Sequence, residues 1–117
     1  MTYSENTRFI ESPTVEEYVR ERFENYPVMA KVAKCESRFR HFKENGDIIR
    51  GEVNESDIGV MQINEYYHSD TADRLGMNLY TLEGNVEYAE YLFKKEGTSP
   101  WLASSKCWGV KNHISMR

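Results

Sequence analysis

The chain reads Asp57-Ile-Gly-Val-Met-Gln-Ile-Asn64 near its centre, and this stretch decides the predicted fold and site. Two polar side chains, Gln62 and Asn64, alternate there with apolar ones after a glycine. The pattern is typical of a strand edge or helix start whose open face offers hydrogen bonds to a ligand. Gly59 would let a ligand or backbone approach closely. Taken alone, the stretch is more simply explained as a turn followed by a half-buried segment, so it does not define a site by itself.

A second motif lies upstream and reads Cys35-Glu-Ser-Arg-Phe39. Glu36 falls near the C-terminal end of a predicted helix, where the helix dipole disfavours an ionised carboxylate. Apolar neighbours would also raise the pKa of this carboxyl by desolvation. A carboxyl that stays protonated near neutral pH is what a general acid needs. The alternative is an ordinary solvated glutamate at a helix end.

Outward from these motifs the pattern predicts an α+β chain that is mostly helical. Thr14 with Glu17 three residues later forms a capping box, and Gly97 is a helix stop. Helices are expected from Thr14 to about Glu24, over 27–37, 67–75 and 82–96, and in a short last turn after Pro100. Residues 43–59 predict a small polar β-hairpin or three-stranded sheet containing Ile48, Ile49 and Val53, after which Met61 begins helical chain. The expected domains are a flexible lead-in at 1–12, a folded domain at 13–108 and a tail at 109–117.

Composition excludes several classes of protein. A length of 117 residues predicts one domain, and 39% hydrophobic residues argue against a disordered chain. The 19 acidic and 15 basic residues argue against a nucleic-acid binder. No apolar run approaches the roughly 20 residues of a membrane span. The polar start, MTYSENTRFIESP, does not resemble a signal peptide, so an export signal is expected to be removed or to lie outside this chain.

Cysteine and histidine spacing gives little sign of a metal site. Cys35 and Cys107 lie too far apart for a CxxC motif or a zinc knuckle, which leaves a disulfide, two free thiols or a redox pair. His41, His68 and His113 show no ligand spacing, so neither a metal nor another cofactor is expected.

Taken together, the two motifs resemble the lysozyme-like superfamily, and above all the catalytic domain of lytic transglycosylases. In that family a Glu-Ser pair ends a helix and a Gly-Leu-Met-Gln-Ile segment lines the cleft. Glu36-Ser37 and Gly59-Val-Met-Gln-Ile63 match these motifs, and the resemblance covers about residues 27–108. It implies a lysozyme-like fold in which a small β-hairpin or sheet flanks a substrate cleft.

The resemblance also implies roles for single residues. Glu36 matches the catalytic acid, Ser37 the serine that orders the site, and Gln62 the glutamine that contacts substrate. The 57–64 run also resembles animal-type lysozymes, on which match Asp57 is a candidate second carboxylate.

Aromatic residues extend the match. Tyr66 and Tyr67 stand where animal-type lysozymes carry tryptophans that stack on sugars, and Trp101 is a further candidate sugar contact. The usual third transglycosylase motif, Ala-Tyr-Asn, is absent, so the residue that would hydrogen-bond the catalytic acid from that side is not evident. Tyr88 is a substitute candidate and is also expected among the substrate-binding residues.

The cysteines resemble those of resuscitation-promoting factors. In that branch a cysteine directly before the catalytic glutamate bonds to a cysteine that follows a late tryptophan. Cys35-Glu36 and Trp101 with Cys107 match this arrangement, which implies a disulfide and an extracytoplasmic location in the periplasm, the cell wall or the medium.

The implied substrate is the β-1,4 bond between N-acetylmuramic acid and N-acetylglucosamine in peptidoglycan. A lytic transglycosylase would use Glu36 alone and release a 1,6-anhydro product, whereas a hydrolytic muramidase would also use Asp57. A non-catalytic glycan-binding module is the alternative from another class. A net charge of −4 gives no long-range attraction to an anionic wall. We therefore expect an enzyme that acts on the glycan strands of its own cell's wall, as part of a larger exported protein. We also expect the chain to be a monomer.

Overall fold

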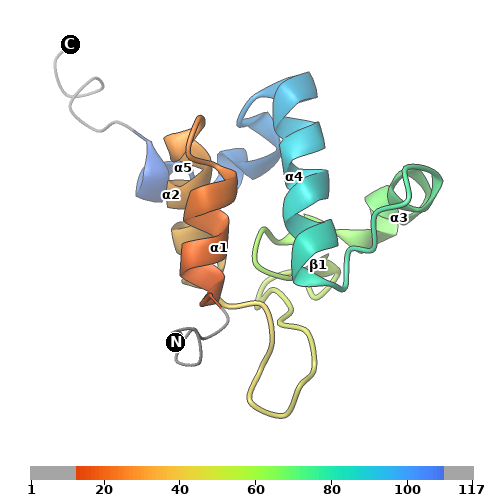
Figure 1. Cartoon of the computed structure of the whole chain (residues 1–117). Coiled ribbons are helices and arrows are strands. Elements are labelled where there is room, and N and C mark those ends of the chain that lie inside the picture. Colours follow the sequence, from red (N-terminus) through yellow and green to blue (C-terminus); the bar gives the residue numbers. More distant parts are fainter. Residues whose placement is uncertain (1–12, 110–117) are drawn as a thin grey trace, which may run out of the picture.

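Helices make up most of the structure, a computed structural model that describes residues 13–109, and a small antiparallel sheet lies near the lower end of α4 in Figure 1. This architecture confirms the predicted mostly helical α+β class. The predicted lead-in at 1–12 and all but the first residue of the tail lie outside the described residues. The elements are α1 Val15–Arg22, α2 Pro27–Ser37, β1 Asp57–Ile58, β2 Ile63–Asn64, α3 Glu65–Arg74, α4 Leu82–Glu96, the 3₁₀ helix η1 Ser99–Ser104 and α5 Ser105–Trp108.

The two longest helices have the bounds that the sequence predicts, because local signals set their ends. Pro27 occupies the first turn of α2, where its missing N–H costs nothing. Helix α4 begins after Thr81, whose hydroxyl accepts from the N–H of Gly84, and ends at Gly97 with a φ of +65°. The capping box of α1 is also present, because Thr14 and Glu17 exchange side-chain-to-backbone hydrogen bonds.

The sheet lies later in the chain than predicted. Around Ile48 and Arg50 the backbone forms only isolated bridges, and Val53 is fully exposed. The paired strands are instead β1 and β2, with Asp57 opposite Asn64 and Ile58 opposite Ile63. The expectation of helix from Met61 is therefore wrong, and α3 begins only at Glu65. The cause is a chain reversal between the strands, at positive φ values of 80° for Gly59 and 53° for Gln62.

Two buried polar side chains hold this hairpin turn. Asn85 of α4 accepts from the N–H of Met61 at 2.9 Å and donates to the carbonyls of Ile58 and Leu79 at 3.0 Å. His41 accepts at Nδ1 from the N–H of Val60 at 3.0 Å. That acceptor role leaves the proton on Nε2, which donates to the carbonyl of Tyr80 at 2.9 Å. Burial lowers the pKa of His41, which favours the same neutral imidazole.

Replacing Gly59 with alanine is expected to lower the free energy of unfolding by about 3 kcal/mol, from backbone strain and overpacking together. The added Cβ would lie 2.7 Å from Cε1 of His41 and closer still to the amide nitrogen of Asn85. Gly46→Ala is the matched control, because Gly46 also has a positive φ but would place its Cβ in open space. Urea denaturation of both variants measures the difference. Equal losses would contradict the close packing around the turn.

The N- and C-terminal helices meet on one side of the molecule. Figure 1 shows α1, α2 and α5 gathered there and α3 on the far side, with α4 between them. A disulfide between Cys35 of α2 and Cys107 of α5 joins the two segments with a Cα–Cα distance of 6.0 Å, as the resemblance implies. No helix within residues 13–109 is long and apolar enough to cross a membrane.

Candidate active site around Glu36

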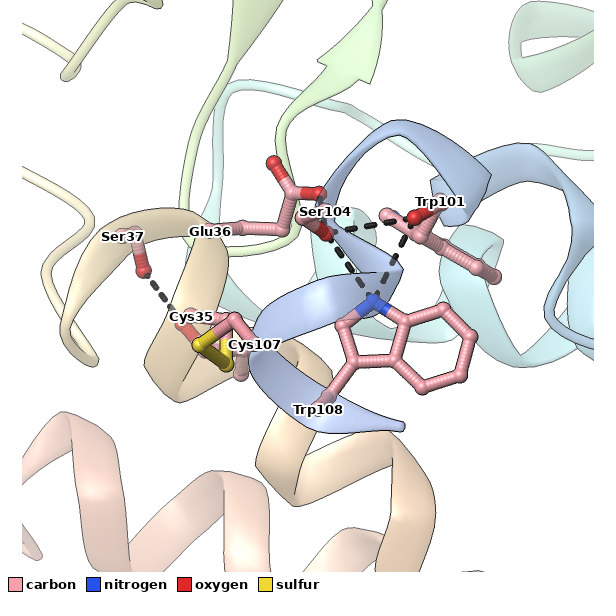
Figure 2. Close-up of a disulfide and its surroundings, with 8 residues drawn as sticks. Cys35, Glu36, Ser37, Trp101, Ser104, Cys107 and Trp108 are labelled. Atoms are coloured by element: carbon pink, nitrogen blue, oxygen red, sulfur yellow. Dashed lines mark hydrogen bonds between the residues drawn. A yellow bond between two sulfur atoms is a disulfide. The ribbon is translucent and has the colours of Figure 1, made fainter. Parts of the chain in front are cut away.

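Glu36 lies on the last turn of α2 with its side chain directed toward the C-terminal segment (Figure 2). The hydroxyl of Ser104 donates to its Oε2 at 2.6 Å. Ser104 ends η1 and is a site residue that the sequence did not indicate. It supplies the hydroxyl partner of Glu36 for which the sequence offered only Tyr88.

Burial is the main influence on the Glu36 carboxyl. Desolvation raises its pKa above the ordinary value for glutamate, and the hydrogen bond from Ser104 opposes this by stabilising the anion. The negative charge of Asp57 is a smaller influence that raises the pKa further. The direction agrees with the prediction from the end of the helix and its apolar neighbours. A glutamate of this kind can hold a proton at a pH where an exposed one has lost it.

Ser37 orders the end of α2 through the backbone. Its hydroxyl is buried, donates to the carbonyl of Ala33 at 3.1 Å and accepts from the N–H of Arg40 at 3.2 Å. The next two residues, Arg38 and Phe39, both have positive φ and turn the chain away from the helix. Ser37 therefore fixes where the helix ends and so where Glu36 stands, without bonding the carboxyl itself.

Asp57 and Asn64 pair across the two-stranded sheet. Nδ2 of Asn64 donates to Oδ1 of Asp57 at 3.1 Å, and Oδ1 of Asn64 caps α3 by accepting from the N–H of Tyr67. Asn64 thus orients the candidate second carboxylate, in addition to any contact with a ligand. Gln62 is half-buried, and its amide donates to the carbonyl of Gly59 at 3.0 Å.

The predicted aromatic contacts divide into exposed and buried rings. Tyr66 and Tyr67 on the first turn of α3 are 79% and 74% exposed and pack edge to face, so their outer faces are open to a ligand. Tyr88 is 1% and Trp101 3% exposed, so both of these rings are buried and a role in binding substrate stays a prediction. Both rings belong to the hydrophobic core, and the polar atom of each has a hydrogen-bond partner.

These partners satisfy the polar atoms of the two buried rings. The hydroxyl of Tyr88 lies 2.8 Å from Nδ1 of His68 on α3 and forms a hydrogen bond with it. The indole N–H of Trp101 donates to the carbonyl of Met61 at 2.8 Å. Trp101 thereby ties η1 to the hairpin turn, and η1 carries Ser104. Its contribution to the site therefore includes structural support.

Groups of metal ligands and surface depressions are two further features that could mark a functional site near Glu36. Within residues 13–109 no three His, Cys, Asp or Glu side chains are grouped as metal ligands, and His113 lies outside them. Among the depressions of the described surface, one lies along residues 42–50 beside Tyr80 and another at the end of α1, and Glu36 lines neither of these two. The cleft that the resemblance implies therefore stays a prediction.

Comparisons with known proteins add no assignment. No protein-family model, no curated protein and no solved structure matches the chain. A functional interpretation therefore depends on the motifs and on the geometry around Glu36.

Proposed function

We propose that this chain cleaves the β-1,4 bond between N-acetylmuramic acid and N-acetylglucosamine in peptidoglycan, as a lytic transglycosylase. The observation that carries the proposal is the half-buried Glu36, whose raised pKa and single hydroxyl partner suit a general acid. Its position in a Glu-Ser pair before the Gly-Val-Met-Gln-Ile hairpin supports the choice of reaction. The Cys35–Cys107 disulfide fits an oxidising compartment outside the cytoplasm, where this substrate lies.

The reaction would use Glu36 twice. Its carboxyl donates a proton to the glycosidic oxygen as the bond from that oxygen to C1 of the muramyl residue breaks. The resulting carboxylate then accepts the proton of the muramyl C6 hydroxyl while O6 bonds to C1, which closes the 1,6-anhydro ring. Glu36 ends in its starting state and no water is consumed. A pKa raised by burial suits both steps, because it keeps the carboxyl protonated for the first step and makes the carboxylate a stronger base in the second.

A hydrolytic muramidase is the second candidate, and one observation favours it. Asp57 is close enough for its charge to raise the pKa of Glu36, and the amide of Asn64 fixes its orientation. Such a carboxylate could stabilise positive charge at C1 or activate water. Water would then take the place of the C6 hydroxyl.

Digestion of purified peptidoglycan, followed by mass spectrometry of the released fragments, tests the proposal. We expect 1,6-anhydromuramic ends, each lighter by one water than the reducing end that hydrolysis leaves. Reducing-end muramic acid would instead support the muramidase. Binding of glycan strands without any released fragment would support a non-catalytic module and contradict both enzymes.

The same assay on Asp57→Asn separates the two enzymes by rate. A transglycosylase should keep most of its rate, whereas a muramidase that needs this carboxylate should lose it about a hundredfold or more. Asp70→Asn is the control, because Asp70 is an exposed residue on α3. It should act like the unmodified chain.

A further inference from the structure

The Ser104 hydroxyl stands at the junction of several hydrogen bonds. Its oxygen accepts from the indole N–H of Trp108 at 2.9 Å. Its single hydrogen has two acceptors within reach, Oε2 of Glu36 at 2.6 Å and the carbonyl of Trp101 at 3.1 Å. A serine hydroxyl can serve only one of them at a time. The shorter distance favours Glu36.

We propose that Ser104 is a positioning residue, which Trp108 orients, and that it assigns the acidic proton of Glu36 to Oε1. The inference deepens the proposed function and rests on it. When Ser104 donates to Oε2, that oxygen acts as an acceptor, and the proton of the neutral acid lies on the other oxygen. Oε1 has no hydrogen-bond partner among residues 13–109. Figure 2 shows one carboxyl oxygen toward Ser104 and the other directed away from it. A glycosidic oxygen would meet the proton on that open side.

The arrangement also suits the state after proton transfer. The carboxylate that remains keeps the hydrogen bond from Ser104 on Oε2, and hydrogen bonds to an ionised acceptor are the stronger kind. Oε1 is then free to accept the proton of the second step. Ser104 thus serves both steps without giving up its own hydrogen. The Trp101 carbonyl can take that hydrogen only when the proton of Glu36 moves to Oε2, which is the unproductive arrangement.

The disulfide holds this chain of hydrogen bonds in place. Cys35 directly precedes Glu36, and Cys107 lies on α5 between Ser104 and Trp108. The disulfide therefore links the helix that carries Glu36 to the segment that carries Ser104 and Trp108, close to the hydrogen bonds between them. Ser104, Trp108 and Glu36 are all half-buried, so water competes only in part for their hydrogen bonds.

Ser104→Ala tests the inference through a titration that needs no activity. Carbon NMR of the Glu36 carboxyl should show a higher pKa in the variant, because the hydrogen bond that stabilises the anion is lost. The other group acting on this pKa, the Asp57 carboxylate of β1, is unchanged. Ser104→Thr keeps a hydroxyl and should restore the original pKa. Ser105→Ala, at the neighbouring position on α5, should leave it unchanged.

The rate of peptidoglycan cleavage gives the second readout. In Ser104→Ala we expect kcat to fall about tenfold or more. The basic limb of the pH–rate profile, where Glu36 loses its proton, should move to higher pH. A uniform loss of rate with an unmoved limb, or an unchanged Glu36 pKa, would overturn the inference. A shifted pKa in a chain that cleaves no peptidoglycan would support the proton assignment and overturn the proposed function.

Discussion

Glu36→Gln is expected to reduce the rate of glycan-strand cleavage by a factor of about 10² to 10⁴, the usual range for a general acid–base group. Glutamine has nearly the same shape and can still accept from Ser104, but it has no acidic proton to give. The loss should therefore appear in kcat, with binding of glycan strands largely retained. Release of soluble fragments from purified peptidoglycan measures it. Glu87→Gln on the exposed face of α4 is the control and should keep the full rate.

The same variant should be no less stable than the original chain at neutral pH. Burial raises the pKa of Glu36 above its value in the unfolded chain, so the folded state holds the proton more tightly. The stability that this gives is complete below the unfolded pKa and is lost as the pH rises through the folded one. Glutamine does not ionise, so the variant should not show this loss. As the pH rises from the unfolded pKa of Glu36 past the folded one, the Tm of the variant should therefore increase relative to that of the original chain. For the cleavage rate, the contradicting result is a Glu36→Gln variant that keeps more than a few per cent of the original rate. Glu36 would then not be the general acid.

Loss of the disulfide is expected to have the largest effect on stability. Cys35 and Cys107 are 72 residues apart, and closing a loop of that length stabilises a domain by about 4 kcal/mol in the chain-entropy model. For a domain of this size the double variant Cys35→Ala with Cys107→Ala should melt roughly 15 to 30 °C lower. Thermal unfolding followed by circular dichroism measures the shift.

Reduction of the unmodified chain provides the matched control. Dithiothreitol should lower its Tm toward that of the double alanine variant and leave the variant unaffected. A change of only a few degrees in both experiments would mean that packing between α2 and α5 holds the segments together without the bond. The Cα–Cα distance of 6.0 Å lies in the normal range for a disulfide.

Helix bounds were predictable because their signals lie within a few residues. Thr14 with Glu17, Pro27 at the start of α2 and Gly97 at the end of α4 each act on the adjacent backbone. The hairpin was not predictable, because its turn depends on partners far along the chain. Asn85 and His41 supply these, and Gln62 adopts a positive φ that no propensity favours.

For the candidate site, the sequence singled out Glu36 but did not indicate its hydrogen-bond partner. Glu36 stands out by its place at a helix end beside Ser37, whereas Ser104 lies 68 positions further on in a plain Ser-Ser pair. The signal that could have indicated it is the position of Cys107, which the proposed disulfide brings beside Glu36. The burial of Tyr88 and Trp101 was not predictable, because a buried ring and a sugar-stacking ring look alike in a sequence.

The separation of Glu36 from Ser104 limits how far the chain can be shortened. A fragment ending before η1 would retain both recognised motifs, with the acid, Asp57 and the hairpin residues, and yet lack the hydroxyl that Glu36 bonds. It would also lose the Trp101 indole, whose N–H donates to the carbonyl of Met61 in the hairpin turn. The smallest unit able to reproduce this site therefore extends through Trp108, and a search for shorter versions by motif alone would select incomplete ones.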